Sequence, residues 1–237
     1  MNKIDISVVV PAYNEEKYIG DCLKSLINQQ TDKSYEVIVV DNNSQDDTAK
    51  VALGFKDKLN LRVILEKKQG RGAARARGFR EALGDIILST DADTILYPGW
   101  IKTLVSPIGG EIAATITSSK VNDLGFLKNT LFNLLQPFFT LLFMWVFGHY
   151  WLGGFSFAIL KTAYKKSGGF NVNIGTYEDA DLAFRVSKIG KIKFINKPVI
   201  FSGRRFKKSL LAGLYQYIHT FIQAFLLKKE PDLNNIR

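Results

Sequence analysis

Four short apolar runs alternate with helix-like segments over the first part of the chain, and this alternation is what most restricts the fold. The runs lie at 6–10, 36–40, 62–65 and 85–88. Continuous apolar runs of this length are typical of parallel strands that are covered on both faces. Between them, segments 15–30 and 73–83 carry apolar residues at helical spacing. Right-handed crossovers then predict an α/β fold with a mostly parallel, Rossmann-like central sheet and helices on both faces.

Paired carboxylates follow the last of these runs. Asp91 and Asp93 stand two residues apart just beyond it, and in an extended chain such residues point the same way. Two carboxylates at a strand end suit Mg²⁺ or Mn²⁺ as ligands. Either ion is most often bound to the phosphates of a nucleotide. A second Asp-x-Asp pair, Asp179 and Asp181, lies in a helix-like stretch. There the two side chains diverge by about 200°, so they are not expected to share a ligand.

The first strand is followed by neither of the usual glycine-rich phosphate loops. Pro11, Ala12 and Tyr13 come next, and no G-x-G-x-x-G turn or G-x-x-x-x-G-K-[ST] loop stands there. A nucleotide is therefore expected to be held by other groups at the carboxyl ends of the strands, where ligands of open α/β sheets bind.

Charge is distributed unevenly along the chain. The formal net charge is +10, but residues 1–160 are neutral, so the basic excess lies in residues 161–237 beside long apolar runs. This combination predicts contact with an anionic membrane surface and not with nucleic acid. The single Cys22 excludes an intrachain disulfide, and residues 1–5 lead into a strand without the apolar region of a signal peptide. We therefore expect a peripheral or monotopic protein on the cytoplasmic face of the membrane.

Five segments occur in the order found in family 2 glycosyltransferases of the GT-A fold. They are VVVPAYNEEKYIGDCLKSLINQ, EVIVVDNNSQDDT, GRGAARARGFREALGDIILSTDADT, GGF and TYEDADL. Together they cover roughly residues 6–190, and over this range the chain resembles that family. The resemblance implies the GT-A fold and the transfer of a sugar from a nucleotide diphosphate. One departure is Ala76, because many relatives have Ala-Arg-Asn at 74–76.

The resemblance also implies a nucleotide site. Its expected residues are Pro11, Ala12, Tyr13, Glu15, Asp41, Ala74, Arg75, Asp91 and Ala92. Asp91 and Asp93 are the implied ligands of Mn²⁺ or Mg²⁺, with Asp93 the stronger of the two. Taken singly, these residues leave simpler interpretations open, since Asp41 can cap a turn and Arg75 can lie on a solvated helix face.

A further pair of carboxylates stands in the segment Thr-Tyr-Glu-Asp at 176–179. One interpretation is a capping box, in which Thr176 begins a helix over 180–189. The other is that a carboxylate at the helix start accepts the proton of a sugar hydroxyl. Both roles are compatible, because one residue can cap while the other reacts. Resemblance to the Thr-Glu-Asp motif of inverting family members favours Asp179 as the catalytic base, with Glu178 beside it.

Residues 129–160 contain no charged side chain, and residues 131–147 are rich in Phe and Leu. A membrane-spanning helix is one interpretation. Polar residues such as Asn133 and Gln136 interrupt this stretch of 17 residues, however, and a crossing would place the two halves of the site on opposite sides of the bilayer. We expect an in-plane or re-entrant segment, with a core helix as the alternative.

The end of the chain carries two further signals. Arg204 and Arg205 follow a strand expected at 199–201, and such a pair either binds phosphate or an incoming acceptor, or is only solvated. A helix at 210–227, flanked by lysine pairs, has one narrow polar stripe and is expected to lie on a membrane. The expected domains are a catalytic domain over 1–206, with a nucleotide half at 1–120 and an acceptor half at 121–206, and a membrane-associating helix within 207–237.

These features and the resemblance together predict an inverting, metal-dependent glycosyltransferase. The expected donor is GDP-mannose, with a UDP-sugar such as UDP-glucose next, and the expected acceptor is a lipid or lipid-linked saccharide, with a polyprenyl phosphate as the alternative. A sugar-phosphate nucleotidyltransferase would need a glycine-rich basic loop after the first strand, which residues 11–15 do not supply. A basic membrane- or nucleic-acid-binding module is the non-enzymatic alternative, and it predicts salt-sensitive DNA binding without nucleotide affinity.

Overall fold

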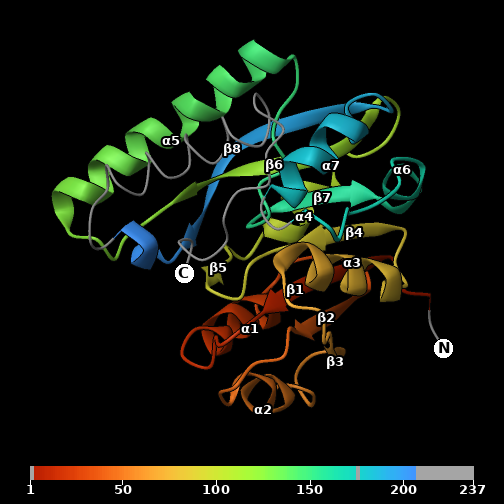
Figure 1. Ribbon diagram of the computed structural model, residues 1–237, viewed down its shortest axis with the longest axis vertical. Helices are drawn as coiled ribbons and strands as arrows, with labels where there is room; N and C mark the ends of the chain where they lie inside the picture. Colours follow the sequence, from red (N-terminus) through yellow and green to blue (C-terminus); the bar gives the residue numbers. More distant parts are fainter. Residues whose placement is uncertain (1–2, 175–176, 207–237) are drawn as a thin grey trace.

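The computed structural model describes residues 3–174 and 177–206, apart from the side chain of Arg205. Its centre is an eight-stranded sheet with the order β3-β2-β1-β4-β7-β6-β8-β5 (Figure 1). The strands are β1 Ile6–Ala12, β2 Tyr35–Asp41, β3 Leu61–Leu65, β4 Ile86–Ser89, β5 Thr94–Ile95, β6 Ile112–Lys120, β7 Phe157–Leu160 and β8 Lys191–Phe201. The helices are α1 Ile19–Ile27, α2 Thr48–Leu53, α3 Arg71–Glu81, α4 Trp100–Val105, α5 Phe126–Phe147, α6 Lys161–Lys166, α7 Glu178–Val186 and the 3₁₀ helix η1 Gly203–Phe206.

The first half of the sheet is parallel, as the alternating runs predict. β1 lies between β2 and β4, and β3 extends the parallel set beyond β2. The runs are continuously apolar because both faces of the strands are covered. Val8 and Val10 pack in a core with α1, α2 and α4, whereas Val9 points to the opposite core with α3 and α7.

The second half of the sheet is mixed. β7 is antiparallel to both β4 and β6, β8 is parallel to β6, and β5 closes the edge against β8. The strand expected at 199–201 is only the end of β8, which has 11 residues. Lysines alternate with apolar residues in its first part, because one side of the strand faces solvent.

Several predicted helix bounds are wrong by a few residues. α1 begins at Ile19 and not near residue 15, and α7 covers Glu178–Val186 in place of 180–189. Glu178 and Asp179 therefore stand in the first turn of α7 and not before it. Tyr177 is the N-cap, while Thr176 and the helix expected at 210–227 lie outside the described residues.

Helix α3 approaches the sheet closely where its side chains reach the strand ends. A Cβ atom at Gly78 would lie 2.3 Å from Cγ1 of Val9, so a larger residue would force the helix away from β1. Gly78 thus allows α3 to hold Arg75 above the carboxyl ends of the parallel strands.

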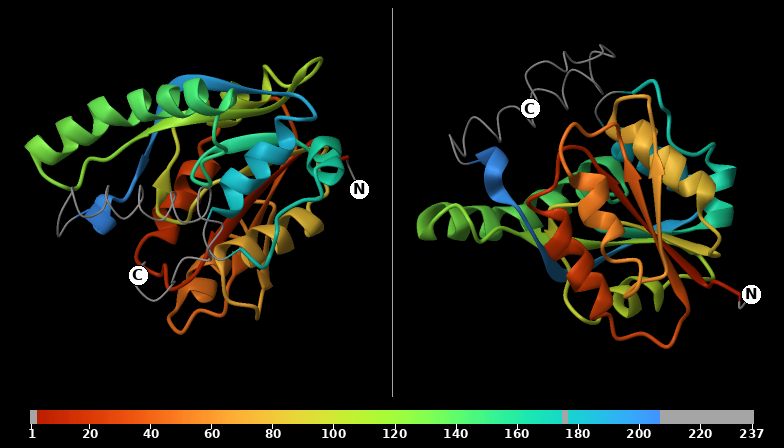
Figure 2. Two further views of the ribbon diagram at one scale, coloured as in Figure 1. Left: turned by 45° about the horizontal axis from the view of Figure 1, so that its top comes forward. Right: turned by 90° about the horizontal axis from the view of Figure 1, so that it is seen from below.

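Helix α5 has its polar side turned toward the protein. It lies along the sheet beside β6 and β8 (Figures 1 and 2). Asn133 accepts a hydrogen bond from the backbone N–H of Val121 at 2.9 Å and donates one to the same residue's carbonyl oxygen at 3.1 Å. Gln136 accepts from the backbone N–H of Ser119 at 3.3 Å. The polar residues that interrupt this apolar segment therefore satisfy the backbone at the end of β6.

The outer side of α5 is apolar and exposed. The stripe consists of Leu127, Leu131, Leu134, Phe138, Leu141 and Trp145, with exposed fractions from 41% at Leu131 to 79% at Trp145. None of the residues of α5 is buried, so the alternative of a core helix is wrong. Among the described helices, α5 alone is long and apolar enough to cross a membrane, since it extends to 22 residues.

Candidate active site

Two of the predicted carboxylates meet at one buried arginine. Arg75 on α3 is 1% exposed. Its Nη2 donates to Oδ1 of Asp91 at 2.6 Å, and its Nη1 donates to Oε1 of Glu178. Burial opposes the charge of Arg75, but these carboxylates hold the pKa of the guanidinium above its ordinary value. Arg75 thus ties the end of β4 to the start of α7, and the alternative of a solvated helix face is wrong.

A glycine makes room for this guanidinium. A Cβ atom at Gly154 would lie 2.1 Å from Nη2 of Arg75. The backbone N–H of Gly154 also donates to Oδ2 of Asp179 at 2.9 Å. The turn before β7 therefore contacts both the buried arginine and the predicted base.

Asp179 is held by donors on both carboxylate oxygens. Besides the bond from Gly154, Oδ1 accepts from Nε1 of Trp151 at 2.9 Å. Burial raises the pKa of Asp179 to about 6, and the negative charge of Glu178 adds to the rise, while Arg75 and the hydrogen bonds oppose it. A carboxylate with a pKa in this range can accept a proton near neutral pH. Asp181, in contrast, pairs with Arg185, which confirms that the second Asp-x-Asp pair does not share a ligand.

A second arginine joins the other predicted metal ligand to the loop after β1. Arg204 in η1 donates from Nη1 to Oε2 of Glu15 at 2.9 Å and from Nη2 to Oε1 of the same residue. Its Nη2 also lies 3.2 Å from Oδ2 of Asp93. The guanidinium carbon stands 4.6 Å from the centroid of the Tyr18 ring. Three segments that are far apart in the sequence thus meet at the guanidinium of Arg204.

The ends of β1 and β2 lie side by side, as a nucleotide site at the strand ends requires. Ala12 is in register with Asp41. One oxygen of Asp41 accepts from the backbone N–H of Ser44 at 3.2 Å, so this residue does cap a turn. Ala74 and Ala92 are 1% and 3% exposed, with their methyl groups in the two cores.

The two carboxylates beyond β4, Asp91 and Asp93, would supply only part of the ligands of a divalent ion, and a substrate would have to supply others. The described residues contain no group of three or more His, Cys, Asp or Glu side chains that could hold a metal. The side chains of Asp91 and Asp93 are 35% and 15% exposed. Two carboxylates with phosphate oxygens and water as further ligands suit Mg²⁺ or Mn²⁺. The residues fit an ion that arrives with a diphosphate.

Comparison with known proteins identifies the chain. The model of glycosyl transferase family 2 matches residues 7–168, from β1 to the turn after α6. The chain belongs to glycosyltransferase family 2. Its relatives include glycosyltransferase AglE of Haloferax volcanii, which is 40% identical over 108 residues, 44% of this chain and 36% of the relative. Dolichol-phosphate mannosyltransferase of Pyrococcus furiosus is 35% identical over 111 residues, 46% of this chain and 32% of the relative. The chain spans less than half the length of these relatives.

Solved structures share the fold of this glycosyltransferase. Residues 1–349 of TarS of S. aureus in complex with UDP-GlcNAc have a TM-score of 0.68 at 22% identity, covering 85% of this chain and 59% of that chain. A mannosyltransferase from Pyrobaculum calidifontis in complex with GDP-Man and Mn²⁺ has a TM-score of 0.62 at 21% identity, covering 92% of this chain and 65% of that chain. These likenesses confirm the predicted GT-A fold.

The predicted site residues of the glycosyltransferase fall into two linked clusters. One contains Arg75, Asp91 and Glu178, with Asp179 next to it, and the other contains Glu15, Asp93 and Arg204. Their link is the short segment 91–93 after β4. Pro11 and Ala12 end β1 and Tyr13 follows, whereas the side chain of Arg205 lies outside the described residues.

Two aromatic residues of the site are not predicted by the sequence motifs. Trp151 donates to the predicted base, and Tyr18 lies against the guanidinium of Arg204. Trp151 stands two residues before the Gly153-Gly154 pair. An indole two residues before a pair of glycines was the available signal, because a buried or partly buried indole N–H usually finds an acceptor.

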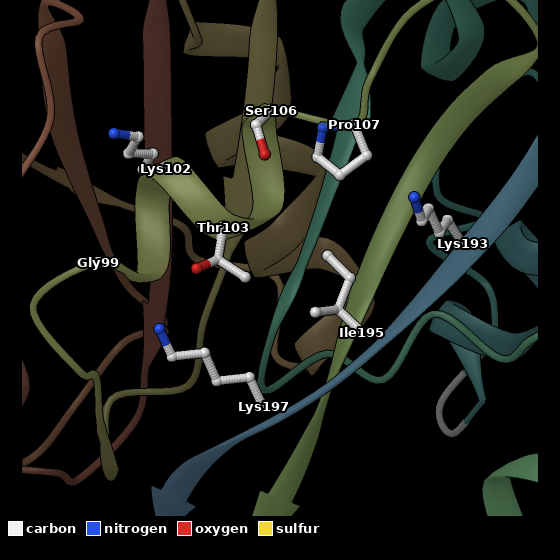
Figure 3. Close-up of a pocket in the computed structure, with 8 residues that line it drawn as sticks. All are labelled: Gly99, Lys102, Thr103, Ser106, Pro107, Lys193, Ile195 and Lys197. Carbon is white, nitrogen blue, oxygen red and sulfur yellow. The ribbon is translucent and has the colours of Figure 1, made fainter.

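A recess of about 460 Å³ lies elsewhere, between α4 and β8 (Figure 3). Lys102, Lys193 and Lys197 surround it, with Thr103 and Ser106 beside them. It contains none of the carboxylates or arginines of the two clusters. A smaller recess, lined by Tyr18, Asp93 and Phe201 among others, adjoins the second cluster.

Proposed function

We propose that this glycosyltransferase moves a sugar from a nucleoside diphosphate to a hydroxyl group in a single, inverting displacement. The observation that carries the proposal is the position of Asp179. This carboxylate, with a pKa of about 6, interacts with the charge of Arg75, which in turn donates to Asp91. A proton acceptor and a pair of phosphate-side carboxylates thus belong to one site.

The donor is proposed to bind at the carboxyl ends of the parallel strands. Pro11, Ala12, Tyr13 and Asp41 border the base and ribose there, and the diphosphate extends toward Asp91 and Asp93. Mn²⁺ or Mg²⁺ held by these two aspartates would neutralise the charge that develops on the leaving diphosphate. Arg204 stands where its fork can contact the same phosphates.

Asp179 is proposed to remove the proton of the incoming hydroxyl as the bond to the sugar forms. The hydrogen bonds from Trp151 and Gly154 fix the orientation of the carboxylate. Oδ1 accepts a second bond from the backbone N–H of Ala180, so Oδ2 is the oxygen that retains a lone pair for the substrate proton. Glu178 is the weaker candidate, because its carboxylate is 2% exposed and is paired with Arg75. Arg75 holds the carboxylates of Glu178 and Asp91 in place.

The favoured donor is GDP-mannose, with a UDP-sugar as the alternative. Similar folds bind GDP-Man with Mn²⁺ in one case and UDP-GlcNAc in another, so the fold suits either base. The favoured acceptor is the hydroxyl of a lipid or lipid-linked saccharide. A polyprenyl phosphate is the alternative, since the relatives include an undecaprenyl-phosphate transferase and a dolichol-phosphate transferase. An ionised phosphate oxygen would not need Asp179.

A lipid acceptor agrees with the outer stripe of α5. A contiguous exposed apolar surface of this kind marks an interaction site, and the stripe runs the length of the helix with Trp145 near its end. Asn133 and Gln136 fasten the helix to β6, and Phe143 packs against Phe184 of α7. These contacts favour a helix that lies in the plane of the membrane, because a crossing would have to break them. The cytoplasmic face is the proposed side, since a soluble nucleotide donor would reach the site from there.

Product analysis tests the proposed reaction. Purified protein is incubated with labelled GDP-mannose or UDP-glucose, Mn²⁺ and a membrane lipid extract, and the lipid product is isolated. We expect a labelled glycolipid whose anomeric configuration is inverted relative to the donor, and loss of the product with Asp179→Asn. Retained configuration, or full activity of Asp179→Asn on a hydroxyl acceptor, would contradict the mechanism.

Sedimentation with liposomes tests the membrane proposal. Leu134→Glu and Phe138→Glu place charges on the outer stripe and are expected to release the protein from anionic vesicles. Leu53→Glu changes an exposed apolar residue of α2 and is the matched control. If the stripe instead joins two copies of the chain, the stripe variants will change the oligomeric state in analytical ultracentrifugation and leave vesicle binding unaltered.

A further inference from the structure

The positive charge of Arg204 lies next to Asp93, which is a proposed metal ligand. Its Nη2 lies 3.2 Å from Oδ2 of Asp93, and the same guanidinium forks onto both oxygens of Glu15. The Glu15 side chain is 13% exposed and that of Asp93 is 15% exposed. The Arg204 side chain is 36% exposed, so water screens these charges only in part, and the ion pairs are stronger than those of an open surface.

This arrangement opposes the binding of a metal by itself. A divalent ion on Asp93 would stand within a few ångströms of the guanidinium, and like charges at that range repel strongly in a partly buried site. Arg204 cannot relieve the repulsion by losing its proton, because the guanidinium stays charged in proteins. It has to move away from Asp93 before an ion can bind there.

The diphosphate of a donor offers a replacement for the lost contacts. Planar guanidinium groups bind phosphate through the same fork that they use for carboxylates. The guanidinium carbon of Arg204 lies over the Tyr18 ring, 4.6 Å from its centroid, and a rotation about the side-chain torsions can redirect the fork without moving η1. Glu15 can remain a partner on the other edge of the guanidinium.

We propose that Arg204 is an internal counterion that occupies Asp93 in the donor-free enzyme and transfers to the diphosphate when metal and nucleotide bind together. This inference rests on the proposed function, because it requires a nucleoside diphosphate as the ligand. It predicts that metal and nucleotide bind with positive coupling. A metal alone must displace Arg204 without compensation, whereas a metal with a diphosphate gives the arginine a new partner.

The free Mn²⁺ signal in electron paramagnetic resonance measures the coupling directly. Mn²⁺ is titrated into wild type and into Arg204→Met, each with and without GDP or UDP. In wild type we expect weak Mn²⁺ binding that tightens when the nucleotide is added. In Arg204→Met we expect Mn²⁺ alone to bind about tenfold more tightly, which corresponds to the loss of one modest opposing interaction, and the tightening by nucleotide to shrink by a similar factor.

Two further variants make the test specific. Lys197→Met removes a positive charge from β8 at the separate recess and should leave both Mn²⁺ constants within twofold of wild type. Arg204→Lys keeps the charge but loses the fork, so its values should lie between those of wild type and Arg204→Met. Circular dichroism checks that each variant is folded, and Arg204→Lys still decides the matter if Arg204→Met is not.

The outcomes separate this inference from the proposed function. If wild type binds neither nucleotide in the presence of Mn²⁺, the proposed function fails. If wild type binds a nucleotide with Mn²⁺ but the Arg204 variants bind Mn²⁺ alone no better than wild type does, the counterion role is wrong and the proposed function survives.

Discussion

Replacement of Asp179 by Asn separates the chemical role of this carboxylate from its effect on stability. The amide has nearly the same shape, and its oxygen can still accept from Nε1 of Trp151. It cannot be ionised and cannot remove a proton. Loss of a general base lowers turnover by about 10²- to 10⁴-fold, while donor binding is expected to remain.

The pKa of about 6 sets the pH range in which wild type responds. Asp179 is active as a base when it is ionised, so the rate should rise with pH through about 6 and level off above 7. The ionised fraction is about 9% at pH 5 and about 91% at pH 7, a tenfold difference that follows from the pKa. A carboxyl with the ordinary value of 3.8 would give almost no change over this range.

The same shift predicts an opposite effect on stability. The folded state binds the proton more tightly than the unfolded state, so the free energy of unfolding falls as pH rises from about 4 through about 6. A change from 3.8 to about 6 corresponds to at most about 3 kcal/mol. Asp179→Asn removes this destabilisation above pH 6. Its amide N–H, however, faces the backbone N–H of Gly154, and the lost hydrogen bond destabilises the variant by about 1 kcal/mol. The variant should therefore be more stable than wild type at pH 8, by at most about 2 kcal/mol, but not at pH 4.

Steady-state kinetics of sugar transfer and urea unfolding, each from pH 4.5 to pH 8, measure both effects. Asp181→Asn is the control, because Asp181 pairs with Arg185 and not with the site. The assignment of the base would be refuted if the wild-type rate of transfer did not fall between pH 7 and pH 5. It would also be refuted if Asp179→Asn showed the same pH profile at a comparable rate.

Three other substitutions test the surroundings of the base. Trp151→Phe removes a hydrogen bond that lowers the pKa of Asp179, so the acidic limb of the rate profile should move to higher pH while the plateau falls only modestly. Arg75→Met leaves Glu178 and Asp91 without their shared partner, and urea unfolding at pH 7 should show a loss of about 3–5 kcal/mol, the usual result of breaking a buried pair. Gly154→Ala places a methyl group on the guanidinium of Arg75, and donor binding by calorimetry should weaken together with stability.

Local patterns were enough to predict the parallel half of the sheet. Val8, Val9 and Val10 are all apolar because alternate side chains pack into different cores. A continuous apolar run in the sequence is enough to indicate such a strand. The position of Asp91 and Asp93 beyond β4 follows from the same pattern. The divergence of Asp179 and Asp181 follows from helix geometry alone.

Long-range pairings were beyond such patterns. Glu15 and Arg204 meet across 189 residues, and their contact depends on the order β4-β7-β6-β8-β5, which no single segment encodes. The length of β8 was underestimated because the lysines on its solvent-facing side interrupt the apolar pattern of the strand. The polar residues of α5 argued against a membrane helix, but their partners are backbone groups of β6 and its following turn. A hydropathy pattern alone does not distinguish a polar side that faces protein from one that faces water.

Titration calorimetry with GDP and UDP, with and without Mn²⁺, tests the central claim most directly. We expect wild type to bind at least one of these nucleotides in the presence of Mn²⁺, with binding that weakens greatly when the metal is chelated. Asp93→Ala is expected to remove the metal dependence while circular dichroism remains unchanged. Wild-type protein that binds neither nucleotide with Mn²⁺ present, or an Asp93→Ala variant whose metal-dependent binding equals that of wild type, would contradict it.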